Sequence, residues 1–134
     1  LLNDASVKLG TPVVHGSIFR FEGMVSVFHP LEGPTYRDMV PEPPPAELAP
    51  SCAEAGVLGV LPGIIGSIQA LETIKVILGL GDPLIGRILT VDTTDMEFRV
   101  LNLKANPDNL VTHANADRIE IKELDGLCAP GLTG

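Results

Sequence analysis

The stretch PSCAEAGVLGVLPGIIGS, Pro50 to Ser67, decides the fold. Ser51 is a residue type that caps helices, and Glu54 three positions later completes a capping-box pattern. The stretch therefore predicts the start of a long helix, which Pro62 should kink or divide. Small residues at spacings of three and four leave one helical face bare, so that another backbone can approach it: Gly56, Gly59, Gly63 and Gly66.

The helical pattern continues to Leu80, and Gly79 and Gly81 provide its stop. The continuous apolar run extends only from Ala55 to Ile68, which is too short for a bilayer, because a membrane span needs about 20 residues. We therefore expect a buried helix, in the core or at a subunit interface, and no membrane association. The spacing of its apolar residues predicts one stripe, made of Ile64, Ile68, Leu71, Ile74 and Leu78.

The residues before this helix predict another helix followed by strands. Leu1 to Leu9 has helical spacing and stops at Gly10, and Pro12 to Gly16 has the composition of a short buried strand. A helix, a glycine stop and a strand in this order are typical of the second half of a βαβ crossover. Residues 17–28 then predict a hairpin or meander with its turn at Glu22-Gly23.

The residues after the long helix predict a second hairpin. Arg87 to Asp92 is strand-like, and Met96 to Lys104 alternates apolar and polar residues, as expected of a strand with one solvated face. Arg118 to Leu124 is a candidate for a further short strand. We expect residues 1–105 to form one α/β unit and residues 106–134 to be a tail or linker.

A long proline-rich segment separates the two hairpins. Residues 29–50 carry seven of the twelve prolines, so they predict a long surface loop rather than a central strand or a regular helix. Loops of this length in a compact domain are usually functional or mobile. The segment ends two residues before Cys52.

Composition limits the classes of function. The chain has 134 residues, 45% of them hydrophobic, so it is long and apolar enough to bury a core. Its formal net charge of −8 argues against nucleic acid and anionic membranes as main partners, because their phosphates would be repelled. Two cysteines make no disulfide framework and predict reduced thiols in a cytoplasmic protein. Residues 1–5 lack the charged start and the long apolar core of a signal peptide.

Cys52 is the residue with the clearest chemical potential. A thiol at a helix N-terminus faces the positive end of the helix dipole, which favours the nucleophilic thiolate. The alternative is that Cys52 is a small, packed residue at the cap, since cysteine is often simply buried. The three histidines, His15, His29 and His113, are too scattered to indicate a metal cluster.

Three stretches together resemble one family. They are GSIFRFEG (residues 16–23), the Tyr36-Arg37 loop with the run PEPPP (residues 41–45), and PSCAEAGVLGVLPGIIGSIQALETIK (residues 50–75). They resemble the MoeB/ThiF adenylyltransferases, the prokaryotic relatives of ubiquitin-activating enzymes, and most closely the MoeB and MoeZ branch. The resemblance extends from Leu1 to about Lys104.

The resemblance implies a fold, a reaction and partners. The fold is a Rossmann-like α/β domain with a mixed sheet, usually in a homodimer. The reaction uses ATP and Mg²⁺ to adenylate the C-terminal glycine of a small ubiquitin-like sulfur carrier of the MoaD/ThiS type, for molybdopterin or other sulfur-transfer pathways. The nucleotide-binding residues of the family precede the stretch that matches Leu1, so the chain corresponds to the C-terminal half and is not expected to adenylate anything alone.

The resemblance also implies roles for individual residues. Cys52 matches a family cysteine that in ThiF-like members forms a covalent link to the carrier. Arg20 lies in a motif near the channel for the carrier tail, where it would steer the carrier's carboxylate or acidic surface, although a surface salt bridge is the simpler and favoured interpretation. Arg37 in the loop has the same two interpretations. The rival to the enzyme is a non-catalytic carrier-binding or dimerisation domain without ATP chemistry.

One departure from the family concerns zinc. Most members hold a structural zinc with two Cys-x-x-Cys pairs, and the matching positions here are Thr35, Asp38, Asn109 and Thr112. Neutral oxygens and one carboxylate suit zinc poorly. We therefore expect no zinc, and another contact, such as Arg118 to Leu124 packing back, must hold the loop and the tail.

Overall fold

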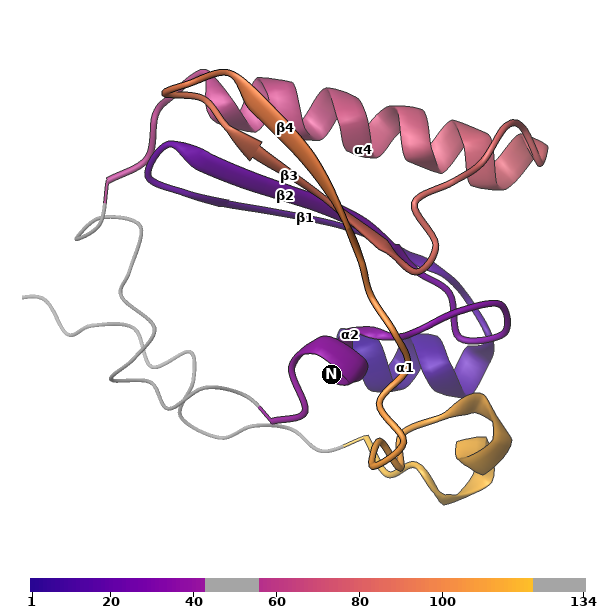
Figure 1. The fold of residues 1–134 in the computed structure, drawn as a ribbon. Helices are drawn as coiled ribbons and strands as arrows, with labels where there is room; N and C mark the ends of the chain where they lie inside the picture. The colour runs from indigo at the N-terminus through magenta and orange to yellow at the C-terminus, as the bar shows by residue number, and fades with distance from the viewer. Residues whose placement is uncertain (43–55, 122–134) are drawn as a thin grey trace, which may run out of the picture.

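The computed structural model describes residues 1–42 and 56–121, which form one four-stranded sheet with helices around it (Figure 1). The strand order is β1-β2-β3-β4, and every neighbouring pair is antiparallel. The elements in chain order are α1 (Leu2–Leu9), β1 (Val13–Phe19), β2 (Glu22–Phe28), α2 (Tyr36–Met39), α4 (Leu61–Leu78), β3 (Arg87–Asp92), β4 (Glu97–Asn102) and the 3-10 helix η2 (His113–Arg118).

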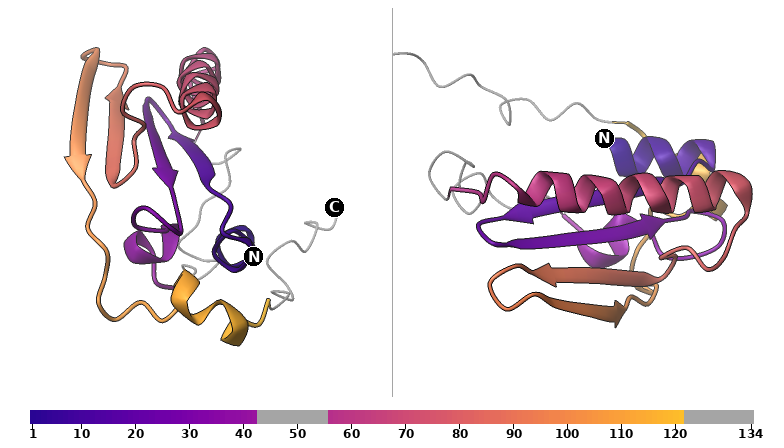
Figure 2. Two further views of the ribbon diagram at one scale, coloured as in Figure 1. Left: turned by 90° about the vertical axis from the view of Figure 1, so that its right-hand side faces the viewer. Right: turned by 90° about the horizontal axis from the view of Figure 1, so that it is seen from above.

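The helices divide into two groups. α4 runs along one face of the sheet over β1 and β2, whereas α1, α2 and η2 gather at one end of the molecule, away from α4 (Figure 2). α1 ends at Gly10, whose φ of 66° lies in the left-handed region that glycine tolerates. The α/β class predicted from the sequence is confirmed, although the described strands pair only antiparallel.

The core lies between α4 and the sheet. Because opposed residues of an antiparallel pair share a face, the register places Val25, Val27 and Val91 on the side that α4 covers. Leu61 and Ile65 of α4 complete this cluster, and all five side chains are at most 2% exposed.

Close approach of α4 requires a residue without a side chain in β2. A Cβ atom at Gly23 would overlap the Ile65 Cδ1 atom and lie 2.6 Å from Ile65 Cγ1. The glycine thus lets the helix sit directly on the strand. By contrast, a Cβ at Gly63 or Gly66 would meet nothing within 4 Å, so the glycine face predicted for close approach of a backbone is unpacked among the described residues.

The long helix differs from its prediction at the start. It begins at Leu61, with Pro62 in its first turn, so the proline starts the helix instead of kinking it. Proline fits there because the first amides of a helix have no intrahelical acceptor. Residues 56–60 are not helical, and the predicted capping box of Ser51 and Glu54 lies outside the described residues.

The predicted apolar stripe of α4 also differs from the face that packs. The buried face is centred on Leu61, Ile65 and Glu72, with Ile68 at its edge. Leu71 and Ile74, both predicted to be buried, are 56% and 51% exposed. The helix is apolar on two sides, so periodicity alone could not select the side that meets the sheet.

Length and composition alone would also allow α4 to cross a membrane. Its 18 residues have a mean hydropathy of 1.4, and 17% of them are buried in the described part of the chain. It is the one helix of residues 1–42 and 56–121 with this property. Its inner face nevertheless buries the carboxylate of Glu72, which is 4% exposed, and such a charge is costly in lipid.

The two hairpins are present, and one of them has a shifted turn. β1 extends to Phe19, so the turn of the first hairpin lies at Arg20-Phe21 and not at the predicted Glu22-Gly23. Arg20 takes the positive φ of 53° that this tight turn requires. The second hairpin is confirmed, with β3 at its predicted bounds.

The end of the described chain is not a strand. Arg118, the predicted start of a short strand, is the last residue of the 3-10 helix η2, and residues 119–121 do not pair with any strand. The rest of that prediction, up to Leu124, lies outside the described residues.

Candidate functional site

The tip of the β1–β2 hairpin holds the chain that follows the proline-rich segment. The backbone amide of Leu58 donates to the carbonyl of Arg20 at 2.9 Å, and Arg20 forms an isolated bridge with Val57. The guanidinium of Arg20 lies 5.2 Å from the centre of the Phe19 ring, within the range of a cation–π contact. Cys52, the other residue predicted for this site, lies outside the described residues.

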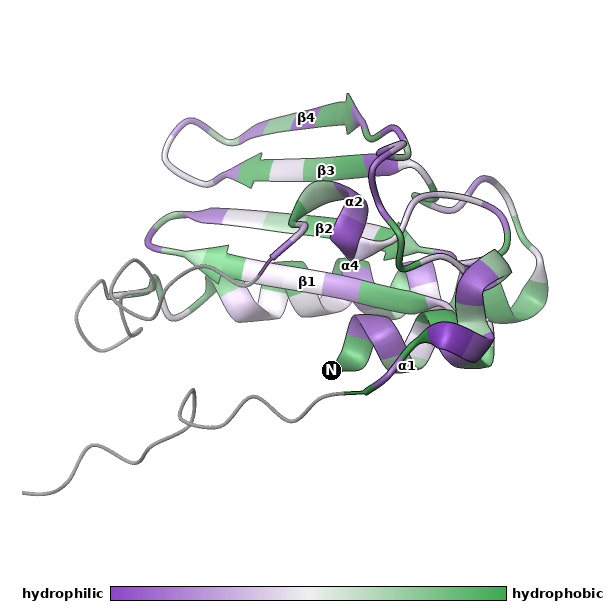
Figure 3. Cartoon of the chain, turned by 90° about the horizontal axis from the view of Figure 1, so that it is seen from below, coloured by the Kyte–Doolittle hydropathy of each residue, from purple (hydrophilic) through white to green (hydrophobic). Residues whose placement is uncertain are grey.

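A hollow of about 530 Å³ lies beside this tip, on the sheet face opposite α4. Figure 3 looks towards this face, with α4 behind the sheet. Side chains of all four strands line the hollow: Ser17, Phe19, Glu22, Met24, Thr90, Asp92, Glu97 and Arg99.

The rim of the hollow is acidic. Arg99 donates to Glu97 at 2.6 Å, so the one basic side chain among the lining residues is already paired. The hydroxyl and the amide of Thr94 donate to Asp92 and lower the pKa of this carboxyl below its ordinary value. The hollow therefore stays anionic at neutral pH and suits a partner surface that brings apolar and basic groups.

Arg37, the second predicted carrier-binding residue, connects α2 to α1. Its Nε and Nη2 atoms donate to the two carboxylate oxygens of Asp4 at 2.9 and 2.7 Å, and Nη1 donates to the carbonyl of Pro41 at 2.8 Å. This bidentate pair lowers the pKa of Asp4, and the same hydrogen bonds raise that of Arg37. All three nitrogen atoms of the guanidinium thus have acceptors within the described chain.

The four positions that match the family's zinc ligands are partly brought together. Asp38 accepts hydrogen bonds from Thr35 and Asn109, whereas Thr112 precedes η2 as its N-cap. Within residues 1–42 and 56–121, no group of three or more His, Cys, Asp or Glu side chains could hold a metal ion. The pattern Thr-x-x-Asp at residues 35–38 is a capping-box signature, a local signal from which α2 could have been predicted.

The tail is tied to α1 as well. Lys8 donates to the carbonyl of Ile119 at 3.1 Å, and Nδ1 of His113 lies 2.9 Å from the carbonyl oxygen of Val7. The expectation that the region beginning at Arg118 packs back against the domain is therefore correct for Ile119, which is 8% exposed.

An aromatic cluster that sequence reasoning missed joins α2 to the sheet. The rings of His15, Phe28 and Tyr36 lie 5.2 to 5.6 Å apart, on the face opposite α4. Burial lowers the pKa of His15, so its imidazole is neutral at neutral pH. A hollow of about 280 Å³ adjoins these rings and is bounded on its other side by Leu1 and Leu2 of the N-terminal segment. No local signal marked these residues, because they meet only in the folded chain.

Comparison with known proteins shows the family to which this chain belongs. The model of the ThiF family matches residues 1–112, and the chain belongs to this family. It is 44% identical over 133 residues to the sulfur carrier protein adenylyltransferase of Thermus thermophilus, a match that covers 96% of this chain and 49% of the relative. It is 46% identical over 111 residues to the probable adenylyltransferase/sulfurtransferase MoeZ of Mycobacterium tuberculosis, with 80% and 28% covered.

The solved structures agree on the fold. The crystal structure of E. coli MccB superposes with a TM-score of 0.65 at 11% identity, over 82% of this chain and 34% of MccB. At this identity the likeness shows the fold alone. The chain spans about half the length or less of the relatives it matches, and the predicted resemblance to the MoeB/MoeZ branch is confirmed.

Proposed function

We propose that the chain is part of an enzyme that uses ATP to adenylate the C-terminal glycine of a ubiquitin-like sulfur carrier. The observation that carries this proposal is the match of residues 1–112 to the ThiF family, together with 44% identity to a sulfur carrier protein adenylyltransferase. The matched residues include the stretch from Pro50 to Lys75 that carries the resemblance. ATP and Mg²⁺ belong to this proposal as substrate and metal of the complete protein.

The hairpin tip and the hollow beside it are our candidates for carrier binding. Arg20 follows the lining residue Phe19, and its guanidinium lies over that ring. In this proposal the acidic hollow receives basic and apolar side chains of the carrier surface, whereas Arg20, outside the hollow, attracts the carboxylate tail. The backbone of Arg20 also binds Val57 and Leu58, and Val57 follows Cys52 by five positions in the sequence. Arg37 is the weaker candidate, because recruiting it would cost its bidentate pair with Asp4.

The test uses the product of the complete gene and a purified carrier. Arg20→Ala is expected to raise the KM for the carrier in ATP–pyrophosphate exchange by about tenfold, since it removes one charged contact of about 1 to 2 kcal/mol. Lys104→Ala, at an exposed residue away from the hollow, is the matched control and should leave the KM unchanged. An unchanged KM in Arg20→Ala would remove the hairpin tip from the carrier site.

Cys52 is tested separately. Cys52→Ala should leave ATP–pyrophosphate exchange intact but abolish transfer of sulfur to the adenylated carrier, because the thiol acts after the adenylate forms. If the thiocarboxylate still accumulates at the wild-type rate, the covalent role is wrong and Cys52 is a packed residue.

We further propose that the complete protein forms a homodimer through the uncovered side of α4. Leu71, Ile74 and Leu78 are more than half exposed there. The register places Phe98 and Val100 of β4 on the same side of the sheet as α4, and both are half exposed, since α4 covers only β1 and β2. An apolar surface that combines a helix flank with a sheet face is typical of a subunit interface.

The double variant Leu71→Glu/Ile74→Glu should convert this dimer into a monomer in sedimentation velocity, because charges would be buried without partners. Thr73→Glu, on the other flank of the same helix, is the control. A wild-type protein that sediments as a monomer at micromolar concentration would contradict the dimer.

The rival proposal is a carrier-binding or dimerisation domain without ATP chemistry. It predicts carrier binding without any pyrophosphate exchange by the complete gene product. Three expectations stay predictions. The absence of zinc rests on the oxygen donors at the four matching positions, and the absence of nucleic-acid and membrane binding rests on the net charge of −8. The cytoplasmic location rests on the two cysteines. The boundary predicted at residue 105 likewise stays a prediction.

A further inference from the structure

Asp38 is the centre of a hydrogen-bonded cluster that joins two distant parts of the chain. Its Oδ2 accepts the backbone amide of Thr35 at 2.6 Å and the Thr35 hydroxyl at 3.0 Å. Its Oδ1 accepts the backbone amide of Asn106 at 2.8 Å and Nδ2 of Asn109 at 3.0 Å. Both oxygens are therefore saturated by four donors, two of them about seventy residues away in the sequence.

The direction of these hydrogen bonds is incompatible with a cation. Every neighbour presents a hydrogen atom to the carboxylate, so the positive ends of four dipoles already surround it. Burial alone would raise the pKa of Asp38, but the bonds from Thr35, Asn109 and Asn106 outweigh burial and lower it. A zinc ion would have to displace donors and would gain one carboxylate and neutral oxygens, which it binds weakly.

We propose that this cluster, Thr35, Asp38, Asn106 and Asn109, is a metal-free clasp that replaces the structural zinc implied by the family resemblance. Its function is to hold α2 against the segment that follows β4. The neighbouring Arg37 binds Asp4 of α1, so α2 is fixed on two sides by consecutive residues.

The clasp has a consequence for the proposed site. α2 ends at Met39, and the described chain stops three residues later, where the proline-rich segment towards Cys52 continues. Anchoring α2 sets the point from which this segment departs, and the bonds of Arg20 to Val57 and Leu58 set the point to which it returns. The clasp thus fixes the end of the first described range, near residue 42, against the segment that follows β4.

The first test is chelation of the native protein. Purified protein treated with a chelator, and a sample supplied with zinc alone, should contain no stoichiometric zinc and should melt at the same temperature. One bound zinc per chain, or a melting temperature that falls on chelation, would overturn the proposal.

The second test measures amide exchange at the two backbone donors. In Asp38→Asn one of the two acceptor oxygens becomes an amide nitrogen, so the Thr35 amide or the Asn106 amide loses its acceptor. Exchange at that amide should rise by about tenfold to a hundredfold, as for loss of a bond to a charged group. Amides in the middle of β2, such as Val25, should keep their protection, which distinguishes a local release from a destabilised fold.

Asp108→Asn is the matched control, because Asp108 lies on the same segment, is exposed and does not bind the cluster through its carboxylate. If Asp38→Asn does not fold, Asn109→Ala removes one donor only and should raise exchange at the same two amides less strongly. Unchanged exchange at Thr35 and Asn106 in the variant that folds would overturn the clasp.

Discussion

Leu61→Ala is expected to lower the free energy of unfolding by about 3 to 5 kcal/mol. Leu61 is completely buried where α4 begins, against Val25, Val27 and Val91 of the sheet. Truncation removes buried apolar surface and leaves a cavity. The sheet cannot close this cavity, because backbone hydrogen bonds hold its strands in place. Urea unfolding followed by far-UV circular dichroism measures the change.

The control for this variant is Leu110→Ala. Leu110 is 77% exposed, so its truncation should change the free energy of unfolding by less than about 0.5 kcal/mol. A loss below about 1 kcal/mol in Leu61→Ala would mean that α4 does not pack on the sheet as described.

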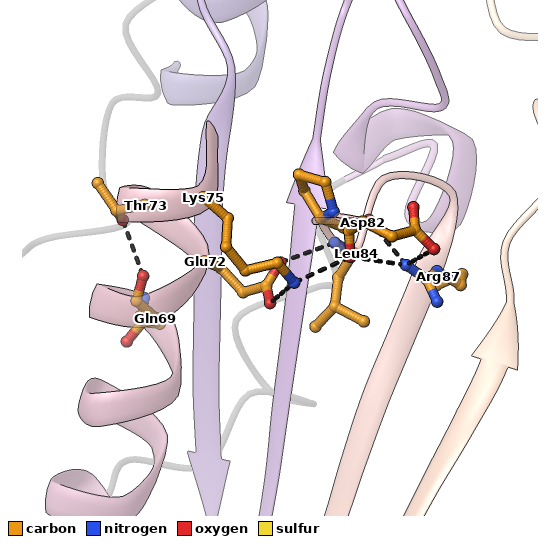
Figure 4. A network of polar contacts seen from close by, with 8 residues as sticks. Gln69, Glu72, Thr73, Lys75, Asp82, Leu84 and Arg87 are labelled. Atoms are coloured by element: carbon orange, nitrogen blue, oxygen red, sulfur yellow. Dashed lines mark hydrogen bonds and ion pairs between the residues drawn. The ribbon is translucent and has the colours of Figure 1, made fainter. Parts of the chain in front are cut away.

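The second large effect is expected at Glu72, which connects α4 to the loop before β3 (Figure 4). One carboxylate oxygen accepts Lys75 Nζ at 2.6 Å, and the other accepts the backbone amide of Leu84 at 2.7 Å. Lys75 also donates to the carbonyl of Asp82, and Arg87 binds both the carbonyl and the carboxylate of Asp82. The network thereby holds residues 82–87 against the end of the helix.

Glu72→Gln should cost about 2 to 3 kcal/mol of the free energy of unfolding. The new amide nitrogen must face either the Lys75 ammonium or the Leu84 amide, and both are donors, so one of them loses its acceptor. This expected loss is small for a broken buried ion pair, because the Lys75 side chain is 22% exposed and water can solvate it.

The same change at Glu97 provides the comparison. Glu97→Gln breaks the pair with Arg99, whose side chain is 66% exposed, and should cost less than about 1 kcal/mol. A double-mutant cycle with Lys75→Met then isolates the coupling between Glu72 and Lys75. Equal losses of unfolding free energy in Glu72→Gln and Glu97→Gln would show that burial of the Glu72–Lys75 pair does not add to stability.

Much of the fold could be predicted because the signals are local. β3 has the bounds that its strand-like residues predict, and α1 ends at the glycine that the pattern marks. The errors fall where two local interpretations compete. Pro62 can kink a helix or begin one, and only the packing of Leu61 against the sheet decides between them.

The candidate site could likewise be predicted only in part. The residue types at positions 35, 38, 109 and 112 are enough to predict that zinc would be poorly bound. They do not reveal that Asp38 is surrounded by four donors, because Asn106 and Asn109 lie about seventy residues away in the sequence and meet it only in the tertiary structure. Likewise, nothing local distinguishes the paired Arg37 from the solvent-facing Arg20.

The sequence by itself determined the class of this protein through the order of its main helices and strands, the family pattern from Pro50 to Lys75, and the residue types at positions 35, 38, 109 and 112. These features depend on residue type and short spacing, which are visible along the chain. Only the tertiary structure decided which flank of α4 meets the sheet and how Asp38 closes the clasp. Both depend on contacts between residues far apart in sequence, whose energies exist only once the backbone has brought them together.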